Sequence, residues 1–179
     1  MPPAHCCARC QQQPPRFVSS LAVWRYEGAV PHLVTGAKFR HRLDLLRLLG
    51  QCLSARVSAL AASRPEVLVP VPLHVSRLRE RGYNQALEIA RVLSRELGIP
   101  IDHHRCRRVL ATTPQTGLDE RARQRNIRGA FEVESPLPWA RVALIDDVVT
   151  TGSTVAELSR VLHRAGATEI QVWAVARTP

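Results

Sequence analysis

The chain has 179 residues, 45% of them hydrophobic, a length that suits one domain with a short appendage and a core that needs no disulfide bonds. No apolar run approaches the ~20 residues that span a bilayer, and the N-terminus lacks the apolar stretch of a secretory signal, so we expect a cytoplasmic protein without membrane insertion. The formal net charge of +10 favours anionic partners such as phosphates and nucleic acids, although the bias towards arginine is equally consistent with genome base composition.

The first segment, residues 1–16, is polar and rich in Cys, Gln and Pro, and it has neither helical nor strand periodicity. An odd number of cysteines in a chain expected in the cytoplasm argues for metal binding or free thiols rather than a disulfide framework. Cys7 and Cys10 have the spacing of half a zinc site, whereas structural zinc takes four ligands. Zn²⁺ is therefore a candidate ligand here, at a site that these two residues leave incomplete.

Beyond this segment the pattern of apolar residues predicts strands and helices. A loose alternation in 17–26 predicts a strand, and a leucine-rich stripe in 31–62 predicts largely helical structure. From residue 66 onward, the expected strands are 67–71, 99–103, 129–133, 141–145 and 169–176. The expected helices are 84–97, which ends at Gly98, and 153–165, which ends at Gly166. This order predicts an α/β fold with a mainly parallel twisted sheet and helices on both faces.

The most informative segment is 142–154, with the sequence VALIDDVVTTGST. Its apolar strand ends in two acids, and a loop rich in Thr, Gly and Ser leads directly into a helix. Ligands bind beyond the carboxyl ends of parallel strands, and the N-terminus of the following helix offers N–H groups and a positive dipole end to an anion. Gly152 allows a close backbone approach. Hydroxyl donors to the same anion are available from Thr150, Thr151, Ser153 and Thr154.

The two acids, Asp146 and Asp147, identify the kind of anion. Carboxylates beside a phosphate would repel it unless the ligand also carries hydroxyl groups for them to bind. A ribose 5-phosphate has this geometry, with its phosphate in the loop and its 2′- and 3′-hydroxyls at the acids. The alternative is an ordinary strand–turn–helix with capping Ser and Thr residues. A Walker A loop is excluded because no Gly-Lys-Ser/Thr occurs.

A second phosphate-binding element is expected in 72–85, directly after the strand at 67–71. Three arginines lie within five residues there, next to Gly82 and before a helix. Guanidinium groups suit bidentate contacts with phosphate. The alternative is a solvated basic face.

The segment 142–154 resembles the phosphoribosyl pyrophosphate (PRPP) signature of type I phosphoribosyltransferases: four hydrophobic residues, two acids and a Thr-Gly-x-Thr loop. The runs VPVPLHVSRLRERGYNQALEIAR, TPQTGLDERARQRNIRGAF and AVWRYEGAVPHLVTGAKFRHR are similar to those of the ComF/GntX family. This resemblance covers essentially the whole chain. It implies the type I phosphoribosyltransferase fold for residues 17–179.

The resemblance also implies roles for individual residues. Asp146 and Asp147 are the expected catalytic residues. The expected 5-phosphate loop comprises Val148, Val149, Thr150, Thr151, Gly152, Ser153 and Thr154. The expected pyrophosphate loop includes Arg79, Arg81 and Gly82, and a flexible loop that closes over the diphosphate includes Thr113, Gln115 and Thr116. Mg²⁺ is expected to bind with PRPP, bridging the diphosphate oxygens.

Members of this family usually begin with two Cys-x-x-Cys pairs that form a small zinc module. Only one such pair, Cys7 to Cys10, occurs here. Residues 1–16 are therefore expected to be the remnant of that Cys-rich segment. Zinc binding through Cys7 and Cys10 needs further ligands to complete the site.

The expected function is that of a ComF-like protein that binds PRPP or a related ribose phosphate with Mg²⁺. It is expected to transfer the phosphoribosyl group to an acceptor that the sequence does not identify, in competence and DNA uptake or in nucleotide metabolism. One alternative is a non-catalytic competence protein that binds single-stranded DNA on the same scaffold and acts with other competence proteins. The basic charge favours it, and the dispersed tryptophans disfavour base stacking. A second alternative is a regulator that senses PRPP.

Overall fold

The computed structural model describes residues 10–11, 14–39, 42–61, 63–111 and 127–178. Within these residues the main sheet has four strands in the order β1-β6-β5-β2, and every neighbouring pair is parallel. The strands are β1 (Ser19–Arg25), β2 (Val67–Pro70), β5 (Arg141–Val149) and β6 (Glu169–Arg177). Parallel strands need crossover connections, and helix α7 (Ser153–Arg164) provides the one between β5 and β6.

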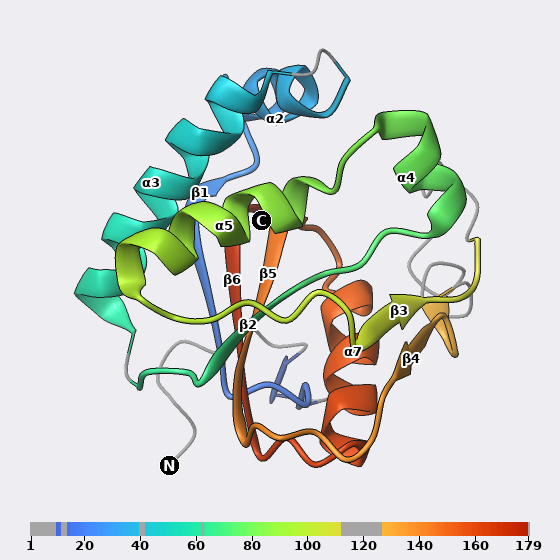
Figure 1. The fold of residues 1–179 in the computed structure, drawn as a ribbon. Coiled ribbons are helices and arrows are strands. Elements are labelled where there is room, and N and C mark those ends of the chain that lie inside the picture. The colour runs from blue at the N-terminus through green and yellow to red at the C-terminus, as the bar shows by residue number, and fades with distance from the viewer. Residues whose placement is uncertain (1–9, 12–13, 40–41, 62, 112–126, 179) are drawn as a thin grey trace.

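Helices cover both faces of this sheet (Figure 1). Alternate residues of β5 enter different cores, because successive side chains of a strand point to opposite faces. Val142 and Leu144 pack with α7, whereas Ala143 and Ile145 pack with helices α3 (Leu43–Leu60) and α5 (Gln85–Leu97). The expected α/β fold, with a mainly parallel sheet between two layers of helices, is confirmed.

Several expected elements differ in extent or in pairing. The helical stretch at 31–62 consists of α2 (Val30–Phe39) and α3. Residues 99–103 contribute only a single parallel bridge, between Leu68 and Ile101. The strand expected at 129–133 is shorter, and it lies outside the main sheet: β4 (Phe131–Val133) pairs antiparallel with β3 (Cys106–Arg108).

Two short elements were not predicted from the sequence, β3 and helix α4 (Val75–Arg81). Helix α4 has seven residues and none of them is buried, so it has no apolar stripe to reveal it. Asp102 separates β3 from the bridge at Ile101. Its Oδ1 accepts hydrogen bonds from the N–H groups of His104 at 2.9 Å and Arg105 at 3.2 Å, and this local turn replaces ladder pairing.

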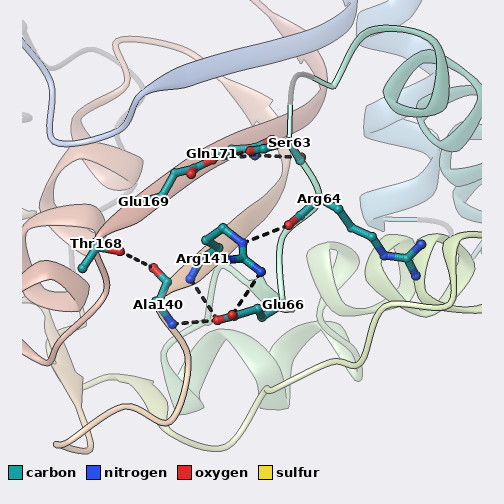
Figure 2. A network of polar contacts seen from close by, with 8 residues as sticks. All are labelled: Ser63, Arg64, Glu66, Ala140, Arg141, Thr168, Glu169 and Gln171. Carbon is teal, nitrogen blue, oxygen red and sulfur yellow. Dashed lines mark hydrogen bonds and ion pairs between the residues drawn. The ribbon is translucent and has the colours of Figure 1, made fainter.

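A polar network joins the strands at the edge where β5 and β6 begin (Figure 2). Glu66 accepts hydrogen bonds from the N–H of Ala140 at 2.8 Å and of Arg141 at 3.2 Å, and it forms an ion pair with the Arg141 guanidinium. Nearby, the amide of the buried Gln171 donates to the carbonyl oxygen of Ser63 at 3.0 Å. These contacts fix the N-terminal edge of the sheet.

The start of the main domain is also held in place. The Val18 N–H donates to the Ile170 carbonyl at 2.8 Å. The two ring nitrogens of His163 contact the carbonyl oxygens of Arg16 and Ala167, each at 2.6 Å. The division into segments 1–16 and 17–179 stays a prediction, because residues 1–9 lie outside the described part of the chain.

Helices α3 and α5 pack closely at Gly50, which gives the first testable prediction. A Cβ atom at this position would lie 2.8 Å from Cβ of Val92. We expect Gly50→Ala to lower the free energy of unfolding by about 1–3 kcal/mol, because overpacking outweighs the gain in helix propensity. Chemical denaturation measures this change.

The matched control is Gly36→Ala in α2, where the added Cβ would make an ordinary contact with Leu45 at 3.5 Å. That variant should be no less stable than the unaltered protein. Equal effects of the two substitutions would contradict close packing at Gly50.

Candidate functional site

The candidate site lies at the C-terminal edge of the sheet, where β5 leads into α7. The strand ends at Val149, and α7 begins at Ser153 after a short turn. Gly152 has φ 76°, in the left-handed region, and open space surrounds the position of its missing Cβ. The backbone conformation, and not crowding, therefore favours glycine here. The Thr151 and Ser153 hydroxyls lie 2.8 Å apart in the same turn.

The first turn of α7 offers N–H groups to an anion. Gly152 occupies the N-cap position and has no side chain to accept from them. Among the described contacts, only Thr151 Oγ1 approaches one of these groups, the N–H of Ser153, and it does so at 3.4 Å. Because the remaining N–H groups also carry the positive end of the helix dipole, this turn suits a phosphate.

Asp146 and Asp147 lie on the last part of β5, and both are half-buried. Asp146 accepts a hydrogen bond from the Asp147 N–H at 2.9 Å, and Asp147 accepts one from the Val148 N–H at 2.8 Å. Each contact occupies one oxygen of a carboxylate. Both acids therefore stand next to the turn before α7.

The second predicted element lies beside them, at the end of β2. The Val71 N–H donates to the Ile145 carbonyl at 2.9 Å, so this chain stays paired with β5 up to the residue before Asp146. Asn84 caps α5 by accepting from the Ala86 N–H, and its amide donates to the Val71 carbonyl at 3.0 Å. The start of α5 is thus fixed to the same edge of the sheet.

The residues expected to form a pyrophosphate loop have a different local structure. Arg79 and Arg81 lie on α4, and Gly82 ends that helix with φ 76°. Arg79 is exposed, whereas the half-buried Arg81 donates to Gln85 Oε1 at 3.3 Å. The arginines are therefore displayed by a helix and not by an open loop, and their role in binding stays a prediction.

Sequence reasoning missed Arg108, the last residue of β3. A single parallel bridge pairs it with His74, just before α4. Burial lowers the pKa of the Arg108 guanidinium, the Asp146 carboxylate opposes this shift, and Arg77 adds to it. No periodicity distinguishes Arg108 from its arginine neighbours, so nothing in the sequence points to it.

Glu157 connects α7 with the chain that leads into β4. It is 9% exposed, it accepts from the Gly129 N–H at 2.9 Å, and it binds the Arg160 guanidinium at 2.6 Å. The hydrogen bond from Arg160 lowers the pKa of Glu157 most, burial opposes it, and the Gly129 N–H lowers it further. The carboxylate thus fixes the position of α7 one turn after the candidate anion site.

A carboxyl group whose pKa is lowered by folding stabilises the protein while it is ionised, and this contribution is lost as the pH falls through the lowered value. We therefore expect Glu157→Gln to reduce the free energy of unfolding at pH 7 by about 1–3 kcal/mol. The variant should also lose less stability than the unaltered protein on acidification from about pH 5 to about pH 3.

Urea denaturation at a series of pH values measures both effects. Glu132→Gln, at an exposed position of β4, is the control and should follow the unaltered protein. If the free energies of unfolding of the unaltered protein and of Glu157→Gln fall equally as the pH is lowered, the proposed role of the ionised carboxylate is contradicted.

The other predicted site residues lie outside the described residues: Cys7, Thr113, Gln115 and Thr116. Cys10 is described and half-buried. Among the described residues, no group of three His, Cys, Asp or Glu side chains could hold a metal ion. In the same part of the chain, none of the helices combines the length and apolar character needed to cross a membrane.

The chain is similar to proteins named for competence and for DNA utilization. It is 36% identical over 178 residues to competence protein F of Haemophilus influenzae, covering 96% of this chain and 78% of that protein. It is 38% identical over 178 residues to DNA utilization protein YhgH of Escherichia coli K12, with the same coverage. No protein-family model matches the chain.

Among solved structures, a purine phosphoribosyltransferase from Pyrococcus horikoshii is similar in fold. The TM-score is 0.42 and the sequence identity 17%, with 74% of this chain and 72% of that chain covered.

Proposed function

Because this chain belongs to the ComF/GntX family of competence protein F, we propose that it binds PRPP or a related ribose phosphate together with Mg²⁺ and transfers the phosphoribosyl group. One observation carries the proposal. Two half-buried aspartates lie near the end of β5, and the turn after this strand leads directly into the N-terminus of α7. A ligand with both hydroxyl and phosphate groups suits this combination of acceptors and donors.

The phosphate on C5 would bind at the turn. Backbone N–H groups at the start of α7 and the hydroxyls of Thr151 and Ser153 are the donors. Their contact with an anion gains from the helix dipole. Gly152 leaves room for the phosphate because no side chain covers this part of the backbone.

The ribose hydroxyls would bind Asp146 and Asp147. Each carboxylate has one oxygen held by a backbone N–H, which orients the group before a ligand arrives. Their negative charge lies near the sugar carbons and would stabilise the positive charge that develops at C1 in an oxocarbenium-like transition state. The bond between C1 and the diphosphate oxygen breaks with its electron pair on the diphosphate, and the acceptor forms the new bond to C1 and loses a proton.

Magnesium fits this site as a companion of the diphosphate. Mg²⁺ prefers one or two carboxylates with phosphate oxygens and water to a cage built by protein alone. The described residues contain a carboxylate pair at the sheet edge and no cluster of three metal-binding side chains. When bound, the ion would neutralise charge on the leaving diphosphate. Asp146 and Asp147 are the residues that would hold it or its water ligands.

The proposal is tested by the double substitution Asp146→Asn and Asp147→Asn. Asparagine keeps an Oδ1 acceptor for the N–H groups of Asp147 and Val148, so the fold should survive. Charged acceptors contribute about 1.5–3 kcal/mol per hydrogen bond, so we expect the affinity for PRPP with Mg²⁺ to fall at least about 100-fold. Calorimetric titration gives the affinity, and thermal unfolding confirms folding.

The control changes the charge equally on an exposed part of the surface, with Glu132→Gln and Glu134→Gln. This variant should bind as the unaltered protein does. Unchanged PRPP affinity in the aspartate variant would refute the proposed site.

A second candidate function, binding of single-stranded DNA, is favoured by the surface of α4 and β3. Arg79 and Arg107 are exposed there. Exposed apolar side chains accompany them, at Val75, Leu78, Val109 and Leu110. The bridge between His74 and Arg108 brings the two elements together. Contacts from these arginines to backbone phosphates would suit a nucleic-acid strand.

This candidate predicts a salt-dependent affinity. Affinity falls as salt rises, and each lost phosphate contact makes the plot of log affinity against log salt less steep by about 0.7 on single strands. We therefore expect Arg79→Gln with Arg107→Gln to weaken DNA binding and to reduce the slope by about 1.4. Fluorescence anisotropy over a salt series measures both quantities.

Arg47→Gln with Arg56→Gln is the control, because these exposed arginines lie on α3, away from α4 and β3 (Figure 1). Equal effects of the two pairs would indicate that net charge, and not this surface, binds the DNA.

A further inference from the structure

Strand β1 forms one end of the main sheet, and among the described residues it pairs only with β6 (Figure 1). The opposite end of the sheet is covered. Beyond β2, the Leu68 N–H donates to the Pro100 carbonyl at 2.8 Å, and the Asp102 N–H donates to the Leu68 carbonyl at 2.9 Å. Within the described residues, the fold thus covers one edge of its sheet and leaves the other unpaired.

The open edge consists of backbone groups on alternate residues of β1. The N–H groups of Val18 and Tyr26, which flank the strand, donate to carbonyl oxygens of β6, each at 2.8 Å. Because backbone groups alternate in direction along a strand, the even-numbered residues face β6 and the odd-numbered residues face outward. The outward N–H and C=O groups of Leu21 and Val23 make no hydrogen bond with any described residue. They are donors and acceptors to which another strand can pair.

The sequence of β1 lacks the features that commonly protect an edge strand, which are lysines, prolines, inward-pointing charges and bulges. Its only charged residue is Arg25, at the last position. The register against β6 is constant along the strand, so no bulge interrupts it. Val18, just before β1, is 62% exposed, the largest exposed fraction among the large apolar side chains described. The edge is therefore unpaired and largely apolar.

We propose that the edge of β1 is an interaction surface for a second copy of this chain, whose own β1 pairs with it antiparallel about a two-fold axis at Ala22. In this register Arg25 lies opposite Ser19 of the second copy, so the one charge on the strand meets no like charge. A second copy presents the same open edge, and one isologous contact therefore pairs both. This inference does not depend on the proposed function.

The sequence of β1 is complementary to itself in this register. Leu21 lies opposite Val23 of the second copy, and the backbone groups of both residues point outward, so the two exchange hydrogen bonds. Their side chains form an apolar cross-strand pair. Val18 lies opposite Tyr26 of the second copy, which covers part of the most exposed apolar side chain.

The net charge of the protein opposes this contact without preventing it. Each copy carries a formal charge of +10, so two copies repel each other. Salt screens this repulsion, with a Debye length of about 8 Å at 0.15 M ionic strength. The paired backbone groups are themselves uncharged. Self-association should therefore strengthen as salt is raised, which is opposite to the salt dependence of nucleic-acid binding.

Sedimentation equilibrium over a series of protein and salt concentrations measures the self-association. Ala22 is half-buried and lies on the two-fold axis, so Ala22→Lys and Ala22→Glu each place two like charges opposite one another. We expect each variant to weaken self-association at least about tenfold. An equimolar mixture of the two variants sets a lysine opposite a glutamate and should restore it.

The control is Ala111→Lys, the same substitution at an exposed position after β3, away from β1 (Figure 1). It should self-associate as the unaltered protein does. Thermal unfolding shows whether each variant folds.

A cysteine at position 22 provides a second test, which decides if the charged variants do not fold. Residues that face each other on the axis form a non-hydrogen-bonded pair with Cα atoms about 4.5 Å apart, within the range of a disulfide bond. Under mild oxidation Ala22→Cys should give a dimer linked through position 22, which peptide mass spectrometry identifies. Ser20→Cys should not link to itself, because the two copies of Ser20 lie four residues apart along the paired strands.

The remaining outcomes overturn the inference. An unaltered protein that stays monomeric at every protein and salt concentration has no such interface. Self-association that Ala22→Lys leaves unchanged would use another surface. Charged variants that fold but do not associate when mixed, or a cysteine variant without a link through position 22, would contradict the antiparallel pairing. Binding of PRPP, or its absence, changes none of these results, so the inference and the proposed function stand or fail separately.

Discussion

The burial of strand β5 on both faces is the constraint on which the rest of the structure depends. Its residues Val142 to Ile145 are at most 1% exposed, because α7 covers one face and α3 with α5 the other. A strand buried in this way cannot slip in register without moving apolar side chains out of both cores. The residues that follow, Asp146 and Asp147, are therefore carried to a fixed place at the edge of the sheet.

The candidate site is assembled on this edge from segments that lie far apart in the chain. The turn before α7 follows β5 directly, whereas α5 reaches the edge through Asn84 and β3 reaches it through the pairing of Arg108 with His74. Glu157 then holds α7 against Gly129, close to β4. Polar contacts between elements, and not only the hydrophobic cores, thus determine which elements meet at this edge.

The electrostatics of the site follow from this assembly. Two carboxylates and the N-terminus of α7 stand side by side, a combination that suits a ligand with hydroxyl and phosphate groups. Exposed arginines on α4 and β3, Arg79 and Arg107, add positive charge to the neighbouring surface. In the proposed function, a small phosphorylated ligand and a nucleic acid would be attracted to neighbouring regions of this surface.

The sequence by itself determined the α/β class, the strand at β5 and the helices at α5 and α7. The apolar periodicity of these elements, and the glycines at which the two helices end, are local signals. It also predicted that Asp146, Asp147 and Gly152 stand together, since they are contiguous in one strand–turn–helix segment. Only the tertiary structure decided the rest. The separate pairing of β3 with β4 and the pairing of Arg108 with His74 depend on contacts between distant segments, which no local pattern reveals. The short helix that carries Arg79 and Arg81 has no buried residue and hence no apolar stripe to predict it.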